Sequence, residues 1–177
     1  RSAAVTACSR DLNRRVGGLG AGPVPVWIPY GVDIDRFQPL TPDQRAAHRA
    51  TLSGQHGVSA EAPWILAIGR LVHKKGFDVL VRAVAKVRAR VGDAQLIIAG
   101  DGPLLDELQR RGVNQGVANA GHFVGPVAHE NVAEWYGAAD VIVVPSVHDP
   151  GGNVDGLPNV FLEGLASGTA VVASRVG

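Results

Sequence analysis

The chain has 177 residues, with 17 lysines and arginines against 16 aspartates and glutamates and a formal net charge of +1. This length fits one domain or slightly more with a real core, and the scattered basic residues argue against nucleic acid as the main partner. Its one cysteine, Cys8, rules out a disulfide framework or a set of thiolate metal ligands, and no apolar run approaches the roughly 18 residues that a membrane-spanning helix needs.

The N-terminal third of the chain predicts short elements separated by loops. Residues 1–22 predict a short strand, a brief helix capped by Ser9 and a glycine-rich connector. Residues 24–28 predict a strand that ends at a Pro-Tyr-Gly turn. A helix should follow with Thr41 as its N-cap and a proline at its first position, and Gly54 should lie beyond its end.

From residue 63 onward, strand and helix patterns alternate regularly. Apolar runs predict strands at 64–68, 96–99, 141–144 and 170–173, and residues 122–124 are expected to form a further short strand. Helical spacing, or a proline suited to a first turn, predicts helices at 77–91, 103–111, 129–137 and 158–166. Apolar strands that alternate with helices indicate a parallel sheet with helices on both faces.

In a sheet of this kind the ligand lies beyond the carboxyl ends of the strands, on the loops that follow them. Those loops are expected at 69–76, 100–103, 125–128 and 145–158. Each candidate binding motif described below falls on one of these loops or on the helix after it.

The segment from Asp155 to Glu163 carries the strongest functional signal. Its two terminal carboxylates lie eight positions apart, around a glycine turn and a proline that suits the start of a helix. The amides at a helix N-terminus attract an anion, whereas two carboxylates beside them would repel it. The segment therefore suits a ligand that has both a diphosphate, which the amides bind, and hydroxyls, which donate hydrogen bonds to the carboxylates. A sugar nucleotide has both. Taken alone, Glu163 is more simply an exposed helical acid, but the order of basic loop, strand, helix and acid–turn–acid favours the binding role.

The loop at 69–76 is the second signal, because it holds Arg70, Lys74 and Lys75 and the whole chain has only three lysines. An arginine fork and a lysine point charge that converge on one loop suit a diphosphate. Gly69 and Gly76 would let the backbone come close to a ligand. A solvated basic turn accounts for the same residues, and the spacing alone does not decide between the two interpretations.

Other motifs are weaker. Gly100-Asp-Gly102 follows a strand, but Leu105 stands where a dinucleotide fingerprint needs its third glycine, so this turn lines a pocket at most. Tyr136 is expected to pack between helix and sheet rather than to stack on a base, and backbone groups around Val127 could pair with a base edge. No histidine forms a metal-ligand pair with an acid, and no Ser–His–acid relay is apparent.

Together these motifs resemble the C-terminal, donor-binding half of the retaining glycosyltransferases of family 4, which have the two-domain GT-B architecture. The resemblance implies an α/β fold, a Rossmann-like parallel sheet with helices on both faces. Residues 1–22 would be the end of the N-terminal acceptor domain and its connector, and 23–177 a donor-binding domain truncated at its C-terminus. The matching stretches are 5–9, 28–33 with Arg36-Phe37, 69–76, 98–103, 123–127, 136–140 and 155–168.

The resemblance also assigns roles. Arg70 and Lys75 would bind the diphosphate and stabilise the leaving group, Glu163 would hold the ribose hydroxyls, and Asp155 would contact the transferred sugar. The reaction would retain the anomeric configuration and need neither a metal nor a cofactor. Asp155 stands where the family usually has the longer Glu, which leaves the donor sugar open. The further donor-binding positions are Gly69, Gly102, Val127, Gly156, Leu157, Pro158 and Asn159.

The implied partners are a nucleotide-sugar donor such as a UDP- or GDP-sugar, and a sugar, lipid-linked or small-molecule acceptor bound mainly by the N-terminal domain. Nucleic acid is not expected, and the location would be the cytoplasm or the periphery of the inner membrane face. The sequence has no methionine and ends directly after an apolar strand. We therefore expect a fragment of a longer enzyme that is inactive alone.

Three alternatives remain open. A GT-B-like sugar-nucleotide epimerase would need its own acid–base pair, and no pair is obviously placed for that role. A phosphorylase would need a pyridoxal-binding lysine, whereas Lys74 and Lys75 already belong to the diphosphate loop. A non-catalytic sugar-nucleotide-binding domain would share the motifs but lack a partner acceptor domain.

Overall fold

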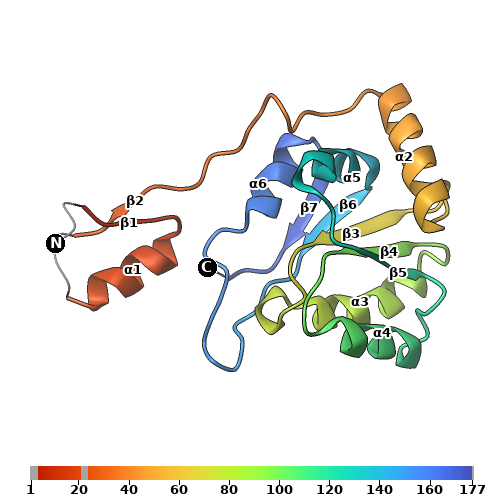
Figure 1. Ribbon diagram of the computed structural model, residues 1–177. Coiled ribbons are helices and arrows are strands. Elements are labelled where there is room, and N and C mark those ends of the chain that lie inside the picture. Colours follow the sequence, from red (N-terminus) through yellow and green to blue (C-terminus); the bar gives the residue numbers. More distant parts are fainter. Residues whose placement is uncertain (1–3, 21–23, 177) are drawn as a thin grey trace.

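A parallel sheet of five strands forms the body of the protein in the computed structural model, which describes residues 4–20 and 24–176 (Figure 1). The strands pair in the order β5-β4-β3-β6-β7, so the first of them in the chain lies at the centre. All four pairings are parallel, which confirms the predicted sheet. The strands are β3 (Trp64–Ile68), β4 (Gln95–Ala99), β5 (Gly121–Gly125), β6 (Val141–Val144) and β7 (Ala170–Ala173).

Helices cover both faces of this sheet, as the alternation of the sequence predicts (Figure 1). One face packs against α3 (Phe77–Arg88) and α4 (Leu105–Asn114). The other packs against α2 (Pro42–His56), α5 (Val132–Ala138) and α6 (Asn159–Ala166). The short 3-10 turns η1 (His73–Lys75) and η2 (His129–Asn131) precede α3 and α5.

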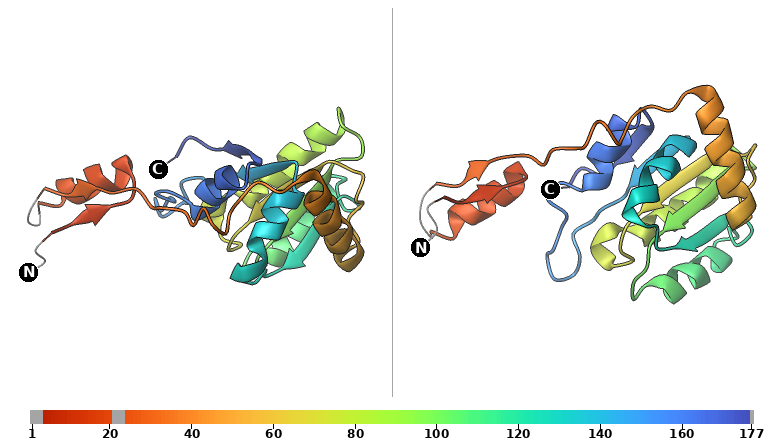
Figure 2. Two further views of the ribbon diagram at one scale, coloured as in Figure 1. Left: turned by 90° about the horizontal axis from the view of Figure 1, so that it is seen from above. Right: turned by 45° about the horizontal axis from the view of Figure 1, so that its top comes forward.

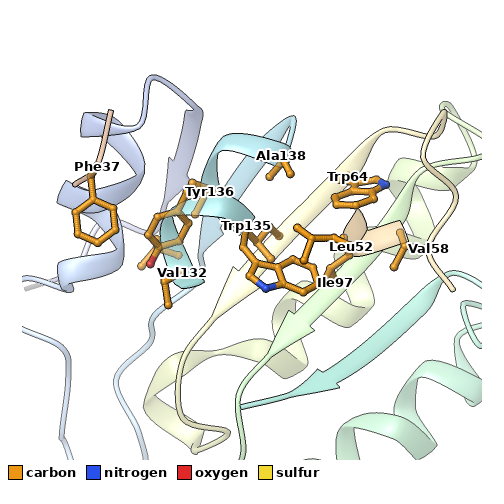
Figure 3. Close-up of a cluster of buried hydrophobic side chains, with 13 residues drawn as sticks. Phe37, Leu52, Val58, Trp64, Ile97, Val132, Trp135, Tyr136 and Ala138 are labelled. Carbon is orange, nitrogen blue, oxygen red and sulfur yellow. The ribbon is translucent and has the colours of Figure 1, made fainter. Parts of the chain in front are cut away.

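The strands carry apolar residues on both faces because each face has its own core. Along β3, Trp64 and Leu66 face the core under α2 and α5, whereas Ile65 and Ala67 face the core under α3 and α4. Figure 3 shows residues of the first core. Within it the ring centroids of Trp135 and Trp64 lie 6.3 Å apart. Burial on both faces is the reason that the central strands β3 and β4 appear in the sequence as largely apolar runs.

A polar cluster ties α2 to this core. The guanidinium of Arg49 donates hydrogen bonds to the carbonyl oxygens of Ala60, Ala62 and Ala138 and to the Asp140 carboxylate. Asp140 also accepts a bond from the Trp64 backbone N–H at 2.7 Å. Burial alone would raise the pKa of Asp140, but the Trp64 N–H and the two arginines Arg49 and Arg45 outweigh it and hold that pKa below its usual value.

A small N-terminal unit lies beside the main sheet rather than on it (Figures 1 and 2). Its strands β1 (Thr6–Ala7) and β2 (Val26–Trp27) pair in parallel across α1 (Arg10–Gly18). Ser9 caps α1 as predicted, since its hydroxyl accepts a bond from the Leu12 N–H. The predicted glycine-rich connector begins inside α1 and then runs into residues 21–23, which lie outside the described part of the chain.

Several element ends differ from the sequence prediction: α3 ends at Arg88 rather than at residue 91, and β2 is shorter than the predicted 24–28. Two further differences have a clear local cause. Helix α2 continues through Gly54 and ends at Gly57, whose φ of 66° gives the left-handed cap that the prediction had assigned too early. Helix α4 begins at Leu105 rather than at residue 103, because Leu104 N–H donates to the Leu71 carbonyl and holds the preceding turn against the β3 loop. None of the helices in the described part of the chain is long and apolar enough to cross a membrane.

Candidate functional site

The candidate site lies where the strand order reverses. Chain connections leave β3 toward β4 on one side and return to β6 on the other, so the loops after β3 and β6 meet at the carboxyl end of the sheet. The two loops are joined directly, because Val147 N–H donates to the Lys74 carbonyl at 2.9 Å. A Cβ on Gly76 would overlap the Pro145 carbonyl. Gly76 therefore makes room for a neighbouring loop, not for a ligand as the sequence had indicated.

Asp155 is the centre of this junction. Its carboxylate lies 3.1 Å from Lys74 Nζ through Oδ1 and 2.8 Å from Lys75 Nζ through Oδ2. Ser146, on the loop after β6, donates a further hydrogen bond to Oδ2 at 2.9 Å. Asp155 is only 8% exposed. The sequence prediction placed Asp155 against a sugar and Lys75 against a diphosphate, whereas the structure brings the two side chains into contact.

The cluster carries an excess of positive charge. Burial alone would raise the pKa of Asp155, but Lys75, Ser146 and Lys74 outweigh it and lower that pKa below its usual value. Asp155 is therefore ionised near neutral pH and balances one of its two lysines. Arg70 is exposed on the same loop, and its side chain has no hydrogen bond or ion pair with the described residues. An anion at this edge of the sheet would meet the remaining positive charge.

Glu163, the second acid, has a different environment. It lies half-buried on α6, and its Oε2 accepts a hydrogen bond from the Tyr136 hydroxyl on α5 at 2.8 Å. Tyr136 is fully buried, which confirms the prediction that it packs between helix and sheet. Burial, with Glu163 beside it, raises the pKa of Tyr136 above its usual value, so the phenol remains a donor.

The residues between the two acids line a cavity of about 150 Å³ next to β6 and β7. Gly156, Leu157 and Pro158 form one wall of it, and Ser146 connects it to the Asp155 cluster. Asn159 opens α6 and is exposed, and no side chain caps this helix. Phe161 N–H donates to the Pro158 carbonyl at 3.0 Å, which leaves the N–H groups of Asn159 and Val160 in the first turn for an acceptor from outside the chain.

The remaining predicted positions lie on neighbouring loops. A Cβ on Gly102 would lie 2.7 Å from the Leu71 carbonyl oxygen, so this glycine also serves loop packing. Gly69 is more open, since its nearest neighbour would be Lys75 Cε at 3.7 Å. Val127 follows β5 and packs half-buried against the core. The structure brings Gly69 close to the lysine cluster but shows no contact of Val127 with it.

The N-terminal unit also reaches this site. A Cβ on Gly156 would overlap Leu12 Cδ1 of α1 and lie 3.2 Å from Cys8 Sγ. The loop that carries Asp155 is therefore packed against the N-terminal unit, which residues 28–41 (the linker) connect to α2. The sequence did not predict this contact. It also did not predict Ser146 and Lys74 as partners of Asp155, or Tyr136 as the partner of Glu163, because no local sequence spacing links these residues to the two acids.

Comparison with known proteins identifies relatives over nearly the whole chain. A model of the family described as glycosyl transferases group 1 matches residues 62–177. The GDP-mannose-dependent alpha-(1-6)-phosphatidylinositol monomannoside mannosyltransferase of Mycolicibacterium smegmatis is 40% identical over 175 residues, which cover 98% of this chain and 44% of the relative. The D-inositol 3-phosphate glycosyltransferase 2 of Catenulispora acidiphila is 38% identical over 172 residues, which cover 92% and 37%.

A solved structure extends the comparison to the fold. HepE of Anabaena, in complex with UDP, matches with a TM-score of 0.83 at 23% identity, over 99% of this chain and 46% of HepE. At this identity the likeness shows the shared fold alone. This chain spans less than half the length of each of the three proteins.

Proposed function

Because the chain belongs to the glycosyl transferases group 1 family and has the Rossmann-like fold of the C-terminal half of a GT-B glycosyltransferase, we propose that it supplies the donor-nucleotide site of a sugar transferase. The observation that carries the proposal is the cluster of Lys74, Lys75 and Asp155 at the reversal point of the sheet. It is a preformed cationic site at the position where sheets of this type bind nucleotides.

Lys75 and Arg70 bind the diphosphate in this proposal. When the bond between the anomeric carbon and the diphosphate breaks, negative charge grows on the departing nucleoside diphosphate. Fixed cations that are already aimed at that charge lower the barrier, because they need no rearrangement during the reaction. Asp155 holds the lysine ammonium groups in place before the donor arrives. Its remaining lone pairs then accept a hydrogen bond that a hydroxyl of the transferred sugar donates.

Glu163 binds the ribose. An ionised carboxylate accepts hydrogen bonds from both ribose hydroxyls, and its bond from Tyr136 occupies only Oε2. In this proposal the N–H groups of Asn159 and Val160, in the first turn of α6, bind oxygens of the nucleotide sugar, and Leu157 and Gly156 lie just before that turn. The loop around Val127 faces the base.

The finer assignment to family 4 and the retention of configuration belong to the same proposal. They are supported by the order of the motifs, from the basic loop through Asp155 to Glu163. The new bond from the acceptor oxygen forms on the face of the sugar that the diphosphate leaves, without a covalent enzyme intermediate. As the bond from the anomeric carbon to the diphosphate breaks, the proton of the acceptor hydroxyl passes to the departing diphosphate oxygen. The cations of the chain neutralise the leaving group, so we propose that no metal is required.

The names of the relatives narrow the choice of donor and acceptor to be tested. The Mycolicibacterium smegmatis relative is named for GDP-mannose and a phosphatidylinositol mannoside, and the Catenulispora acidiphila relative for inositol 3-phosphate. We therefore propose GDP-mannose as the first donor to examine and an inositol-containing acceptor. That acceptor binds mainly outside these residues, and residues 1–177 alone bind donor weakly and transfer no sugar.

Calorimetric titration of the full-length protein with UDP-, GDP- and ADP-sugars tests the proposal. We expect one donor to bind, and Glu163→Ala to weaken it by about tenfold or more, since hydrogen bonds to a charged group contribute about 1.5–3 kcal/mol. Glu61→Ala is the matched control, because Glu61 is exposed on the loop before β3 and has no ion pair with the described residues. Unchanged affinity in Glu163→Ala would remove the ribose assignment, and no binding of any sugar nucleotide would remove the function.

A further inference from the structure

The hydrogen bond between Tyr136 and Glu163 joins two helices that are distant in the sequence. Tyr136 lies on α5 and Glu163 on α6, and the donor and acceptor atoms are 2.8 Å apart. Nothing in the resemblance assigns a role to this tyrosine beyond packing. Its hydroxyl is nevertheless the only described protein group that donates to the Glu163 carboxylate.

Tyr136 is itself held from several sides. Its ring lies 5.9 Å from the ring of Phe37, measured between centroids, and the two side chains are neighbours in Figure 3. Its backbone carbonyl accepts a bond from Thr169 Oγ1 at 2.7 Å. The next residue, Gly137, has no room for a Cβ because Leu40 from the linker packs against it. The Phe37 ring therefore sets the place of the phenol, whereas Thr169 and Leu40 hold the backbone of α5, and none of the three takes part in the proposed ligand binding.

The geometry also sets the direction of the bond. A fully buried phenol beside a carboxylate keeps its proton and donates it, so Glu163 is the acceptor. The bond uses Oε2, and Oε1 has no donor among the described residues. A glutamate on a helix otherwise has several rotatable bonds, which must all be fixed when it binds a ligand.

We propose that Tyr136 is a positioning residue that holds the Glu163 side chain in one conformation with Oε1 ready for the ribose hydroxyls. This inference rests on the proposed function, because it assumes that Glu163 binds the ribose and adds that Tyr136, which does not touch the ribose, orders Glu163. Because a side chain that is already ordered loses less conformational entropy on binding, the Tyr136 bond should improve affinity for the ribose by about three- to tenfold. Contacts to the diphosphate should not depend on Tyr136.

The test is the ratio of two dissociation constants in the full-length protein. The probes are the nucleoside diphosphate, among UDP, GDP and ADP, that binds most tightly, and its 2′-deoxy form. Tyr136→Phe keeps the ring and removes only the hydroxyl. We expect the wild-type protein to prefer the ribose form by about tenfold, and Tyr136→Phe to reduce that preference about threefold or more while affinity for inorganic diphosphate stays the same. A preference that is unchanged in Tyr136→Phe would overturn the proposal.

Two controls separate positioning from folding and from the ribose contact itself. Thr169→Val removes a hydrogen bond to Tyr136 but none to Glu163, so it should lower the melting temperature without changing the ratio. In the Glu163→Ala background, Tyr136→Phe should have no further effect on the ratio; an equal effect there would show that the tyrosine acts on the fold. If Glu163→Ala itself keeps the ribose preference, the proposed role of Glu163 fails independently of Tyr136.

Discussion

At the scale of single residues, the shared carboxylate of Asp155 explains how two lysines can remain side by side. Two ammonium groups on adjacent residues repel each other, and a buried carboxylate within 3.1 Å of both offsets that repulsion. The pair is thereby kept at the edge of the sheet without a ligand. Asp155 contacts both lysines and accepts a hydrogen bond from Ser146 as a third donor.

Lys75→Ala should therefore weaken binding of the nucleoside diphosphate by about ten- to a hundredfold in the full-length protein, the range for losing one charge-assisted hydrogen bond. Lys74→Ala should have a smaller effect, because Lys74 is the more exposed of the two, at 38% against 22% for the side chains. Titration at two salt concentrations provides the measurement, since screening weakens the wild-type interaction more than that of the variant.

Lys86→Ala is the matched control for this experiment. Lys86 lies exposed in the last turn of α3 and has no ion pair with the described residues. The Lys86→Ala substitution removes one positive charge, as Lys75→Ala does, but leaves the cluster of Lys74, Lys75 and Asp155 intact. An equal loss of affinity in Lys86→Ala and Lys75→Ala would show that net charge alone, and not the geometry at Asp155, governs binding.

At the scale of the elements, the strands were predictable and their partners were not. Runs such as Trp64–Ile68 are apolar at every position, and in a chain of alternating elements this pattern is typical of a strand buried on both faces. The contact between Tyr136 and Glu163 joins two helices and depends on how both lie on the sheet. Likewise, the pairing of Asp155 with Lys75 follows from β6 returning beside β3, an order that local periodicity does not contain.

Helix α2 shows where element ends are hard to predict. Two glycines lie near its C-terminus, and the sequence alone favoured Gly54 as the one beyond the end. Gly54 lies inside the helix with open space around it, whereas Gly57 has a φ of 66° and ends the helix. At Gly54 the flexibility of glycine weakens the helix, whereas at Gly57 the same flexibility allows the left-handed conformation that ends it.

Replacing each glycine with alanine should have opposite effects on stability. Gly54→Ala should raise the free energy of unfolding by about 0.5–1 kcal/mol, since alanine restricts the unfolded chain and suits a helix interior. Gly57→Ala should lower it by about 1 kcal/mol, because an L-residue is strained at a left-handed cap. Denaturant unfolding of both variants gives the measurement, and stabilisation by Gly57→Ala would contradict the observed cap.

At the scale of the whole molecule, the N-terminal unit and the main sheet meet at the loop of Asp155. Between them the chain runs through a linker without helix or strand, which packs back onto α5 through Phe37 and Leu40. The contact of Leu12 and Cys8 with Gly156 lies one residue from Asp155. A displacement of the N-terminal unit would therefore shift the loop of Asp155, which holds the Lys74 and Lys75 side chains in place.

Gly156→Ala tests whether this contact matters to the site. The added Cβ would overlap the Leu12 side chain, and overpacking of this kind costs about 1–3 kcal/mol unless the neighbour moves. Because the φ of Gly156 is not in the left-handed region, alanine is not strained by the backbone itself. We expect weaker donor binding in the full-length protein, as the displaced loop carries Asp155 away from Lys75.

The double variant Gly156→Ala with Leu12→Ala then distinguishes a clash from a need for glycine at this position. Truncating Leu12 removes the atoms that the new Cβ would meet, so donor affinity should return toward that of Leu12→Ala alone. If affinity stays low, Gly156 acts through the ligand rather than through α1. Recovery would mean that the packing of the N-terminal unit sets the position of the Asp155 loop, and through it the readiness of the cationic site.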